Sequence, residues 1–246
     1  PAALKAYLVA YNVLSTLGWG YILTLTLIHI FNLDRKSDSL PSPALKDKPW
    51  LSRQFSSSSS VGASLPGVLQ PIYQRATTTY SRVGSQTTFV QSFAILEVVH
   101  ALLGWVRSPI QTTAMQVASR LFLVWGVTEQ FPEVRSNPFF TSMVFAWSFT
   151  EVIRYSFYAF NLVGMNPYPL LWLRYTTFYI LYPLGASSEA FVNLATLPSS
   201  IKAWQLTDYV RAVLFAIWWP GLYIMYTYMI VQRRKVLGKP KSIKSE

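Results

Sequence analysis

The sequence predicts an all-α membrane protein, a bundle of six transmembrane helices formed by a single domain that covers residues 1–246. Two observations predict this fold class. The first is composition: hydrophobic residues make up 52% of the chain and charged residues only 13%, against about 25% charged residues in a typical soluble domain. Such a chain has too few charged side chains to cover a water-soluble surface. The second observation is the presence of long apolar segments.

Six segments are apolar over most of the ~20 residues that a helix needs to cross the hydrocarbon core of a membrane. They are about Leu8–Phe31, Phe89–Val106, Thr113–Val127, Phe139–Val163, Pro169–Leu184 and Val210–Val231. A polar stretch at about 32–84, which includes the serine run Ser56–Ser60, separates the first two segments. Low-complexity polar sequence cannot bury a core, so we expect a flexible loop here. For its last third, around Ile72–Arg82, packing against the membrane is the alternative. A basic tail follows at about 232–246.

The net charge of +11 is concentrated beside the apolar segments. Basic residues in such places orient membrane spans and contact anionic lipid headgroups, so we expect contact with membrane lipid and no nucleic-acid partner. An even number of spans places both termini on one side. The cluster Arg233-Arg234-Lys235 predicts that this side is cytosolic, whereas Arg35 and Lys36 favour the opposite orientation.

A metal or thiol site is not expected. The chain has no cysteine and only two histidines, which excludes disulfides, cysteine metal sites and a cysteine nucleophile. Glu97 and His100 have the Glu-x-x-His spacing of a di-iron carboxylate site, but such a site needs two copies of the motif and the chain has one. We expect His100 to form a hydrogen bond with Glu97 or with a neighbouring span.

Ionisable residues within membrane spans are candidates for function, because a charge at the centre of a bilayer is unfavourable. Here they are Glu97, His100, Arg120, Glu151, Arg154, Arg174 and Glu189. The alternative is that they form structural ion pairs between helices. Glu151 and Arg154 are three residues apart and can pair along one helix. Otherwise Glu151 holds an arginine from another helix, which frees Arg154 for an anionic ligand.

Tyr182 and Glu189 are the candidates for acid–base chemistry. They are seven residues apart, so on a continuous helix they share one face at a separation of ~10 Å. Pro183 and Gly185 lie between them, and a proline distorts the turn before it. We expect this broken turn to bring the carboxylate nearer the phenol, and a Tyr and a Glu so placed suit proton transfer.

Several motifs resemble, in order, those of the very-long-chain (3R)-3-hydroxyacyl-CoA dehydratases of the endoplasmic reticulum, once called protein-tyrosine-phosphatase-like proteins. The resemblance covers nearly the whole chain and is closest to a fungal-type member. The matching motifs are Tyr11-Asn-Val with Gly18-Trp19, Leu96-Glu-Val-Val-His100, Gln116-Val-Ala-Ser-Arg120, Glu151-Val-Ile-Arg-Tyr-Ser-Phe-Tyr158, Arg174-Tyr, Leu181-Tyr-Pro-Leu-Gly with Glu189, and Gln232-Arg-Arg-Lys-Val.

The resemblance implies a hydro-lyase that dehydrates 3-hydroxyacyl-CoA to trans-2-enoyl-CoA, the third step of very-long-chain fatty acid elongation. Tyr182 and Glu189 fall on the family's catalytic positions. Substrate-binding or site-supporting positions are matched by Arg120, Glu151, Arg154, Arg174 and Gly185. The resemblance further implies no cofactor and a multi-pass location in the endoplasmic reticulum membrane with both termini cytosolic. The implied partners are long- and very-long-chain 3-hydroxyacyl-CoA, an elongase, a ketoacyl-CoA reductase and an enoyl-CoA reductase.

One departure bears on the older family name. Where the phosphatase-like motif has its cysteine, this chain has Ala101, in Ala101-Leu-Leu-Gly-Trp-Val-Arg107. A cysteine phosphatase needs the thiolate as nucleophile, so that activity is excluded. Two rival functions are a non-catalytic membrane adaptor of the elongation complex, which would not need Tyr182 or Glu189, and a small transporter that uses the buried Glu and Arg residues as a relay.

Overall fold

The computed structural model describes residues 2–37 and 64–238, and within these ranges the chain is helical and has no β-strand. The first helices are α1 (Ala2–Phe31), α4 (Gln70–Ala76), α5 (Thr79–Ser92) and α6 (Ile95–Leu102). Helix α7 (Ile110–Leu121) continues into the π-helical segment η2 (Phe122–Thr128), and the short 3₁₀ helix η3 (Pro132–Ser136) follows. The second half holds α8 (Pro138–Val163), α9 (Tyr168–Arg174), α10 (Phe178–Leu194), the 3₁₀ turn η4 (Ile201–Ala203) and α11 (Leu206–Leu237).

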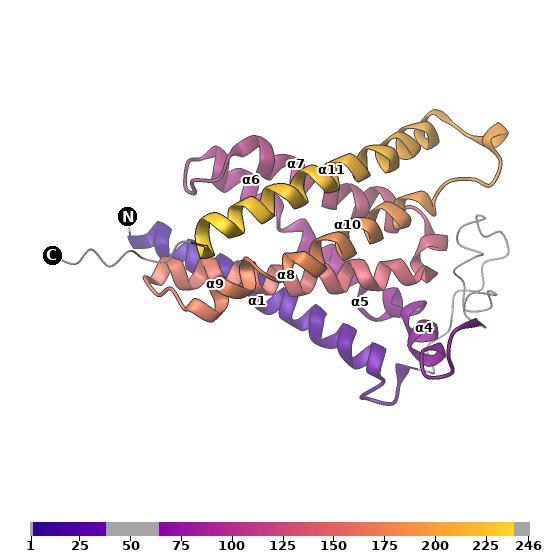
Figure 1. The fold of residues 1–246 in the computed structure, drawn as a ribbon, viewed down its shortest axis with the longest axis horizontal. Helices are drawn as coiled ribbons and strands as arrows, with labels where there is room; N and C mark the ends of the chain where they lie inside the picture. Colours follow the sequence, from indigo (N-terminus) through magenta and orange to yellow (C-terminus); the bar gives the residue numbers. More distant parts are fainter. Residues whose placement is uncertain (1, 38–63, 239–246) are drawn as a thin grey trace.

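Helix α8 is the central element of the bundle. It packs along α1 and along α10, and α11 in turn packs along α10 (Figure 1). Figure 1 also shows that α1 begins and α11 ends at the same end of the bundle, where α6 turns into α7 and α8 turns into α9. We call this the terminal end, and the end where α10 leads into α11 the opposite end. Every candidate site residue lies on α8 or on a helix beside it.

The sequence of α8 explains where this helix begins and ends. The Asn137 side chain accepts a hydrogen bond from the backbone N–H of Phe139 at 2.9 Å, which satisfies one of the unpaired donors at a helix start. Pro138 occupies the first helical position, where its missing N–H has no consequence. Gly164 follows the last turn with φ 91°, a left-handed conformation that glycine adopts without a steric penalty.

The buried core lies on the opposite-end half of α8. Phe140, Met143, Val144 and Trp147 of α8 are each at most 2% exposed. They belong to one apolar cluster with residues of α1, α5, η2 and α10, namely Trp19, Ile22, Val83, Leu123, Val124, Val127 and Val192. These contacts fix α8 against its neighbours next to the site.

The outer faces of the bundle are apolar. Within the described ranges, α1 and α11 are the two helices that are long and apolar enough to cross a membrane. Leu14 and Leu17 on α1, and Val213, Ile217 and Ile224 on α11, are all more than half exposed. Apolar surface of this extent is unusual on a water-soluble protein and suits contact with lipid chains.

All six predicted apolar segments are helical, but three of them are divided. The second is split between α5 and α6, the third continues from α7 into η2, and the fifth is split between α9 and α10. The predicted loop at about 32–84 is wrong at its C-terminal boundary, because α4 and the start of α5 occupy residues 70–84 and bury Thr77, Thr78 and Thr79. Ser56–Ser60 lies outside the described residues. The predicted basic tail begins inside α11, which ends at Leu237.

Gly185 lies where α10 packs closely against α8. A Cβ atom added there would lie 3.3 Å from the Cβ of Ala146. We predict that Gly185→Val lowers the thermal unfolding midpoint in detergent, because overpacking of this kind costs roughly 1–3 kcal/mol. Adding Ala146→Gly should recover part of the loss. Gly221→Val on α11 is the matched control, since a Cβ there meets nothing within 4 Å. Equal midpoints for the Gly185 and Gly221 variants would show that the helix contact does not limit stability.

Candidate active site

A chain of buried and partly buried charges joins α6, α7 and α8. The guanidinium group of Arg154 on α8 donates to both carboxylate oxygens of Glu97 on α6, at 2.7 Å each. Its Nε donates to Glu151 Oε2, one turn earlier on α8, at 2.5 Å. A bidentate arginine–carboxylate pair fixes distance and orientation together, so this contact sets the position of α6 against α8.

Glu151 also holds the arginine of a third helix. Its Oε1 accepts a hydrogen bond from Arg120 Nη1 on α7, and the guanidinium carbon of Arg120 lies 5.1 Å from the ring centroid of Trp147. Glu151 is 2% exposed. Both arrangements considered for Glu151 therefore occur together, and Arg154, engaged by two carboxylates, is not free for an anionic ligand.

The charge chain ends at Tyr155. The Tyr155 hydroxyl donates to Glu97 Oε1, while its ring contacts the Arg154 guanidinium at 4.3 Å and the ring of Tyr11 on α1 at 5.9 Å. His100 does not join this chain, because its Nε2 is bonded to the Tyr7 hydroxyl of α1 at 3.0 Å. This contact confirms the expected hydrogen bond to a neighbouring helix. Among residues 2–37 and 64–238, no group of three or more His, Cys, Asp and Glu side chains is placed to hold a metal ion.

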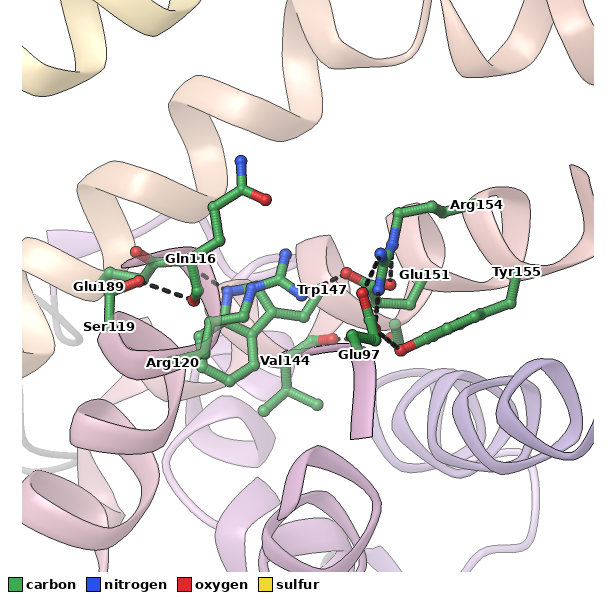
Figure 2. A network of polar contacts seen from close by, with 11 residues as sticks. Glu97, Gln116, Ser119, Arg120, Val144, Trp147, Glu151, Arg154, Tyr155 and Glu189 are labelled. Carbon is green, nitrogen blue, oxygen red and sulfur yellow. Dashed lines mark hydrogen bonds and ion pairs between the residues drawn. The ribbon is translucent and has the colours of Figure 1, made fainter. Parts of the chain in front are cut away.

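Glu189 lies at the other end of the charged group and is held by two indoles. Trp147 Nε1 of α8 donates to Glu189 Oε1 at 2.6 Å, and Trp218 Nε1 of α11 donates to Oε2 at 3.2 Å. Figure 2 shows Glu189 beside Trp147 and Arg120, with Glu151 and Arg154 farther along α8 and Glu97 of α6 beside Arg154. Trp147 thus contacts both Glu189 and Arg120, which connects the carboxylate to the charge chain.

Tyr182 lies two turns before Glu189 on α10. The two residues share one uninterrupted helix, so their separation along the axis is ~10 Å. The predicted broken turn is not present. Pro183 cannot donate to the carbonyl of Tyr179, and the Tyr226 hydroxyl of α11 donates to that carbonyl instead, at 3.4 Å. No described residue forms a hydrogen bond with the Tyr182 hydroxyl, which leaves it available to a ligand.

Arg174, the last residue of α9, forms no ion pair with the charge chain, and the Tyr158 ring lies between it and Arg154, whose guanidinium carbon is 6.0 Å from that ring. Arg174 Nη2 donates to the Tyr158 hydroxyl at 3.0 Å, and its guanidinium carbon lies 4.7 Å from the ring centroids of both Phe157 and Tyr158. The structure therefore brings together Arg120, Glu151, Arg154 and Glu189. Tyr182 and Gly185 share the helix of Glu189, and Arg174 occupies a separate place at the terminal end.

Sequence reasoning did not identify the indole partners of Glu189 or the hydroxyl partner of Glu97. Trp147, Glu151 and Tyr155 follow one another at four-residue intervals, which places them on one face of α8, and all three are at most 3% exposed. This spacing was a readable signal for Trp147 and Tyr155. Trp218 had none, because it meets Glu189 from a helix that is separated from α10 by a long connection.

The arrangement suits proton transfer in a site shielded from water. It offers a carboxylate oriented by two N–H donors, a tyrosine hydroxyl without a protein partner, and a guanidinium group beside the carboxylate. The charge chain holds three carboxylates, if Glu189 is included, and two guanidinium groups. Positioned acids and bases of these types contribute on the order of 10²–10⁴ in rate when they reach a substrate proton.

The chain resembles known proteins over most of its length. Residues 91–239 match the family model described as protein tyrosine phosphatase-like protein, PTPLA. The chain is 46% identical over 171 residues to a probable very-long-chain (3R)-3-hydroxyacyl-CoA dehydratase of Schizosaccharomyces pombe, covering 69% of this chain and 82% of the relative. It is 37% identical over 250 residues to the very-long-chain (3R)-3-hydroxyacyl-CoA dehydratase hpo-8 of Caenorhabditis elegans, covering 96% of each. No solved structure matches the chain.

The charge chain predicts a coupled effect of substitutions at Arg154 and Glu97. Arg154→Ala leaves two buried carboxylates with one guanidinium partner, and breaking a buried pair in this way costs about 3–5 kcal/mol. Arg154→Lys should recover only part of the loss, since an ammonium group cannot form the bidentate contact. Thermal unfolding in detergent measures both effects.

The double variant Arg154→Ala/Glu97→Gln tests the pairing itself. The double variant no longer leaves Glu97 charged without a partner. Its loss of stability should therefore be smaller than the sum of the losses of the two single variants, by a coupling energy of roughly 0.5–3 kcal/mol. Strictly additive losses would show that the contact between the two side chains contributes nothing to stability.

Proposed function

We propose that this chain, which belongs to the family of protein tyrosine phosphatase-like proteins, removes water from (3R)-3-hydroxyacyl-CoA to give trans-2-enoyl-CoA, the third step of the very-long-chain fatty acid elongation cycle. The observation that carries the proposal is the likeness to relatives that bear the dehydratase name, over 96% of the chain in one of them. The site supports it, because Tyr182 and Glu189 both lie on α10 within the region that the family model matches.

The reaction needs two proton transfers, which the site residues can provide. The C2–H and C3–O bonds of the substrate break, a double bond forms between C2 and C3, and the 3-hydroxyl leaves as water. Glu189 and Tyr182 supply between them the proton acceptor for C2 and the proton donor for the departing hydroxyl. Trp147 and Trp218 fix the Glu189 carboxylate, so that it meets the substrate in one orientation.

The buried cation nearest to this carboxylate has an electrostatic role. Negative charge develops on the thioester carbonyl as the C2 proton leaves, and a preorganised positive group stabilises such charge strongly in a dry site. Arg120 donates to Glu151 and lies over Trp147, the indole that holds Glu189. This places a fixed, partly buried positive charge beside the reacting groups.

We further propose six membrane spans in the endoplasmic reticulum membrane, with both termini cytosolic. The spans are α1, α5 with α6, α7 with η2, α8, α9 with α10, and α11. The helix count supports termini on one side, as Figure 1 shows for α1 and α11. Lysine and arginine occur at both ends of the bundle. At the opposite end, however, Arg82, Arg135 and Arg211 each pair with a carboxylate, which reduces the net positive charge there and favours the terminal end as the cytosolic one.

The reaction also indicates which enzymes act beside this one. The substrate carries a 3-hydroxyl, so a ketoacyl-CoA reductase must supply it after an elongase has extended the chain. The product carries a conjugated double bond, so an enoyl-CoA reductase must consume it. Both intermediates are amphiphiles that partition into membranes. We propose an elongase and these two reductases as neighbours of this protein in the same bilayer.

The assigned catalytic pair predicts a large loss of turnover with an intact fold. Tyr182→Phe removes one oxygen that has no protein partner, and Glu189→Gln keeps the size of the side chain. Each should reduce the turnover of a long-chain 3-hydroxyacyl-CoA by a factor on the order of 10² or more, with thermal stability near that of the wild type for Tyr182→Phe. The double variant should be little slower than the slower single variant, because residues that act as a unit are not additive.

Tyr179→Phe is the matched control for Tyr182→Phe. Tyr179 lies one turn earlier on α10 and is 36% exposed. Tyr179→Phe keeps the ring that contacts Tyr226 and Arg233 of α11 and keeps the backbone carbonyl that accepts from Tyr226. It removes only a hydroxyl that has no hydrogen bond among the described residues. Its turnover should stay within about twofold of the wild type, as is usual for a surface substitution. Wild-type rates in both Tyr182→Phe and Glu189→Gln would refute the assigned site.

The topology predicts which sites a protease can reach in sealed microsomes. Tags at both termini, and one inserted after Arg107 in the turn between α6 and α7, should be cleaved from the cytosolic side. A tag inserted after Lys202, between α10 and α11, should be protected until detergent is added. Termini of opposite accessibility would require an odd number of spans, and protected termini would invert the orientation.

A further inference from the structure

Among the described residues, the arginines differ in whether a carboxylate neutralises them. Five of them pair with a carboxylate: Arg82 with Asp34, Arg120 with Glu151, Arg135 with Glu129, Arg154 with Glu97 and Glu151, and Arg211 with Asp208. Arg174 and Arg233 are also partly buried, yet neither has a carboxylate within ion-pair distance among the described residues. A partly buried positive charge without a counter-charge is unfavourable, so these two positions call for an explanation.

Arg174 has a buried N–H donor that forms no hydrogen bond within the described residues. Its Nη2 is bonded to the Tyr158 hydroxyl, but its Nη1 is buried and has no hydrogen-bond partner in the described chain. Rings of Phe157, Tyr158 and Tyr175 surround the guanidinium group at 4.7–5.9 Å. The aromatic rings hold the planar group in place, and they leave its N–H donors unsaturated.

Arg233 has the same character and lies near the same junction. Its guanidinium carbon is 5.6 Å from the ring centroid of Tyr179, and its Nε is buried without a partner among the described residues. Tyr179 is in the first turn of α10, which begins four residues after Arg174. The Thr176 hydroxyl, in the turn between α9 and α10, is likewise buried and unpaired. Two guanidinium groups and a hydroxyl with free donors therefore border the start of α10.

We propose that Arg174 and Arg233 form a phosphate-binding site at the junction of α9 and α10, and that it takes the phosphate groups of the CoA part of the substrate. The proposal rests on the proposed function. Guanidinium groups bind phosphate oxygens through paired N–H donors and do not lose their charge. The N-terminal end of the 17-residue helix α10 adds a partial positive charge on the same side.

The position of the site agrees with the order of groups along the substrate. Arg174, Tyr182 and Glu189 follow one another along α9 and α10 from the terminal end inward, and Tyr182 lies eight residues after Arg174. Phosphates bound at the junction would leave the pantetheine arm to run along α10, and the thioester would reach Tyr182 and Glu189 before the acyl chain enters the apolar interior. A phospholipid headgroup offers the same phosphate chemistry, so the experiment must separate the two sources.

The experiment compares two thioesters of the same long-chain 3-hydroxyacyl group, one with CoA and one with pantetheine, which has no phosphate. Arg174→Gln and Arg233→Gln should each raise KM for the CoA thioester about tenfold or more, the usual loss for one hydrogen bond to a charged group. For the pantetheine thioester, kcat/KM should change by less than about threefold, a difference too small for a lost charged contact. Arg174→Lys keeps the charge and should fall between the wild type and Arg174→Gln.

Arg234→Gln is the control, because Arg234 is exposed beside Arg233 and its loss removes the same charge. Its KM for the CoA thioester should stay near the wild-type value. Equal losses on both thioesters in Arg174→Gln and Arg233→Gln would overturn the proposal and assign the arginines to the fold or to a lipid headgroup. Unchanged KM values in both variants would also overturn it.

A binding measurement keeps the site testable apart from the reaction. Free CoA should raise the thermal unfolding midpoint of the wild type, pantetheine should not, and both arginine variants should lose the effect of CoA. If the wild type turns over neither thioester, the proposed function fails. The rise of the unfolding midpoint with CoA would still show whether the phosphate site exists. The same shift in the wild type and in both variants would refute that site.

Discussion

The structure depends on one buried carboxylate, Glu151, which pairs with two arginines from different helices. A charge in an apolar interior is stable only when its partners are close and well oriented. Arg120 and Arg154 satisfy Glu151 from α7 and α8, and Arg154 extends the contact to Glu97 on α6. Because no member can leave without exposing a partner, the three helices are held in a single register.

This register determines where the reactive groups can lie. Trp147 is one turn from Glu151 on the same face of α8, so fixing Glu151 also fixes the indole that binds Glu189. Glu189 in turn receives Trp218 from α11, a helix that packs chiefly on α10. The orientation of one carboxylate thus depends on α8 and α11 together. Apolar packing, which acts without direction, could not position a proton-transferring group in this way.

The sequence predicted those features that depend on neighbouring residues. Apolar length located six helical regions, the spacing of Glu151 and Arg154 predicted their pairing, and composition predicted a lipid-facing exterior. Features that depend on distant segments were not predictable. The proline at 183 suggested a broken turn, but a hydroxyl from α11 supplies the partner that the Tyr179 carbonyl lacks, and α10 continues. Likewise, α4 and α5 occupy sequence too polar to read as a span, because their buried threonines bond to backbone carbonyls.

The pairing of charges also separates two roles that the sequence could not distinguish. In the sequence, Arg120, Arg154 and Arg174 are all arginines within apolar segments, and nothing distinguishes their roles. In the structure, Arg120 and Arg154 each pair with at least one carboxylate, which makes them part of the scaffold and of its internal electric field. Arg174 faces aromatic rings that hold it but cannot neutralise it. A membrane protein that binds an anionic headgroup needs both kinds of arginine, since a scaffold charge must be cancelled in the empty protein and a binding charge must not be. The carboxylates Glu97 on α6 and Glu151 on α8 pair with Arg120 and Arg154, and their placement therefore decides that Arg174 remains for the substrate.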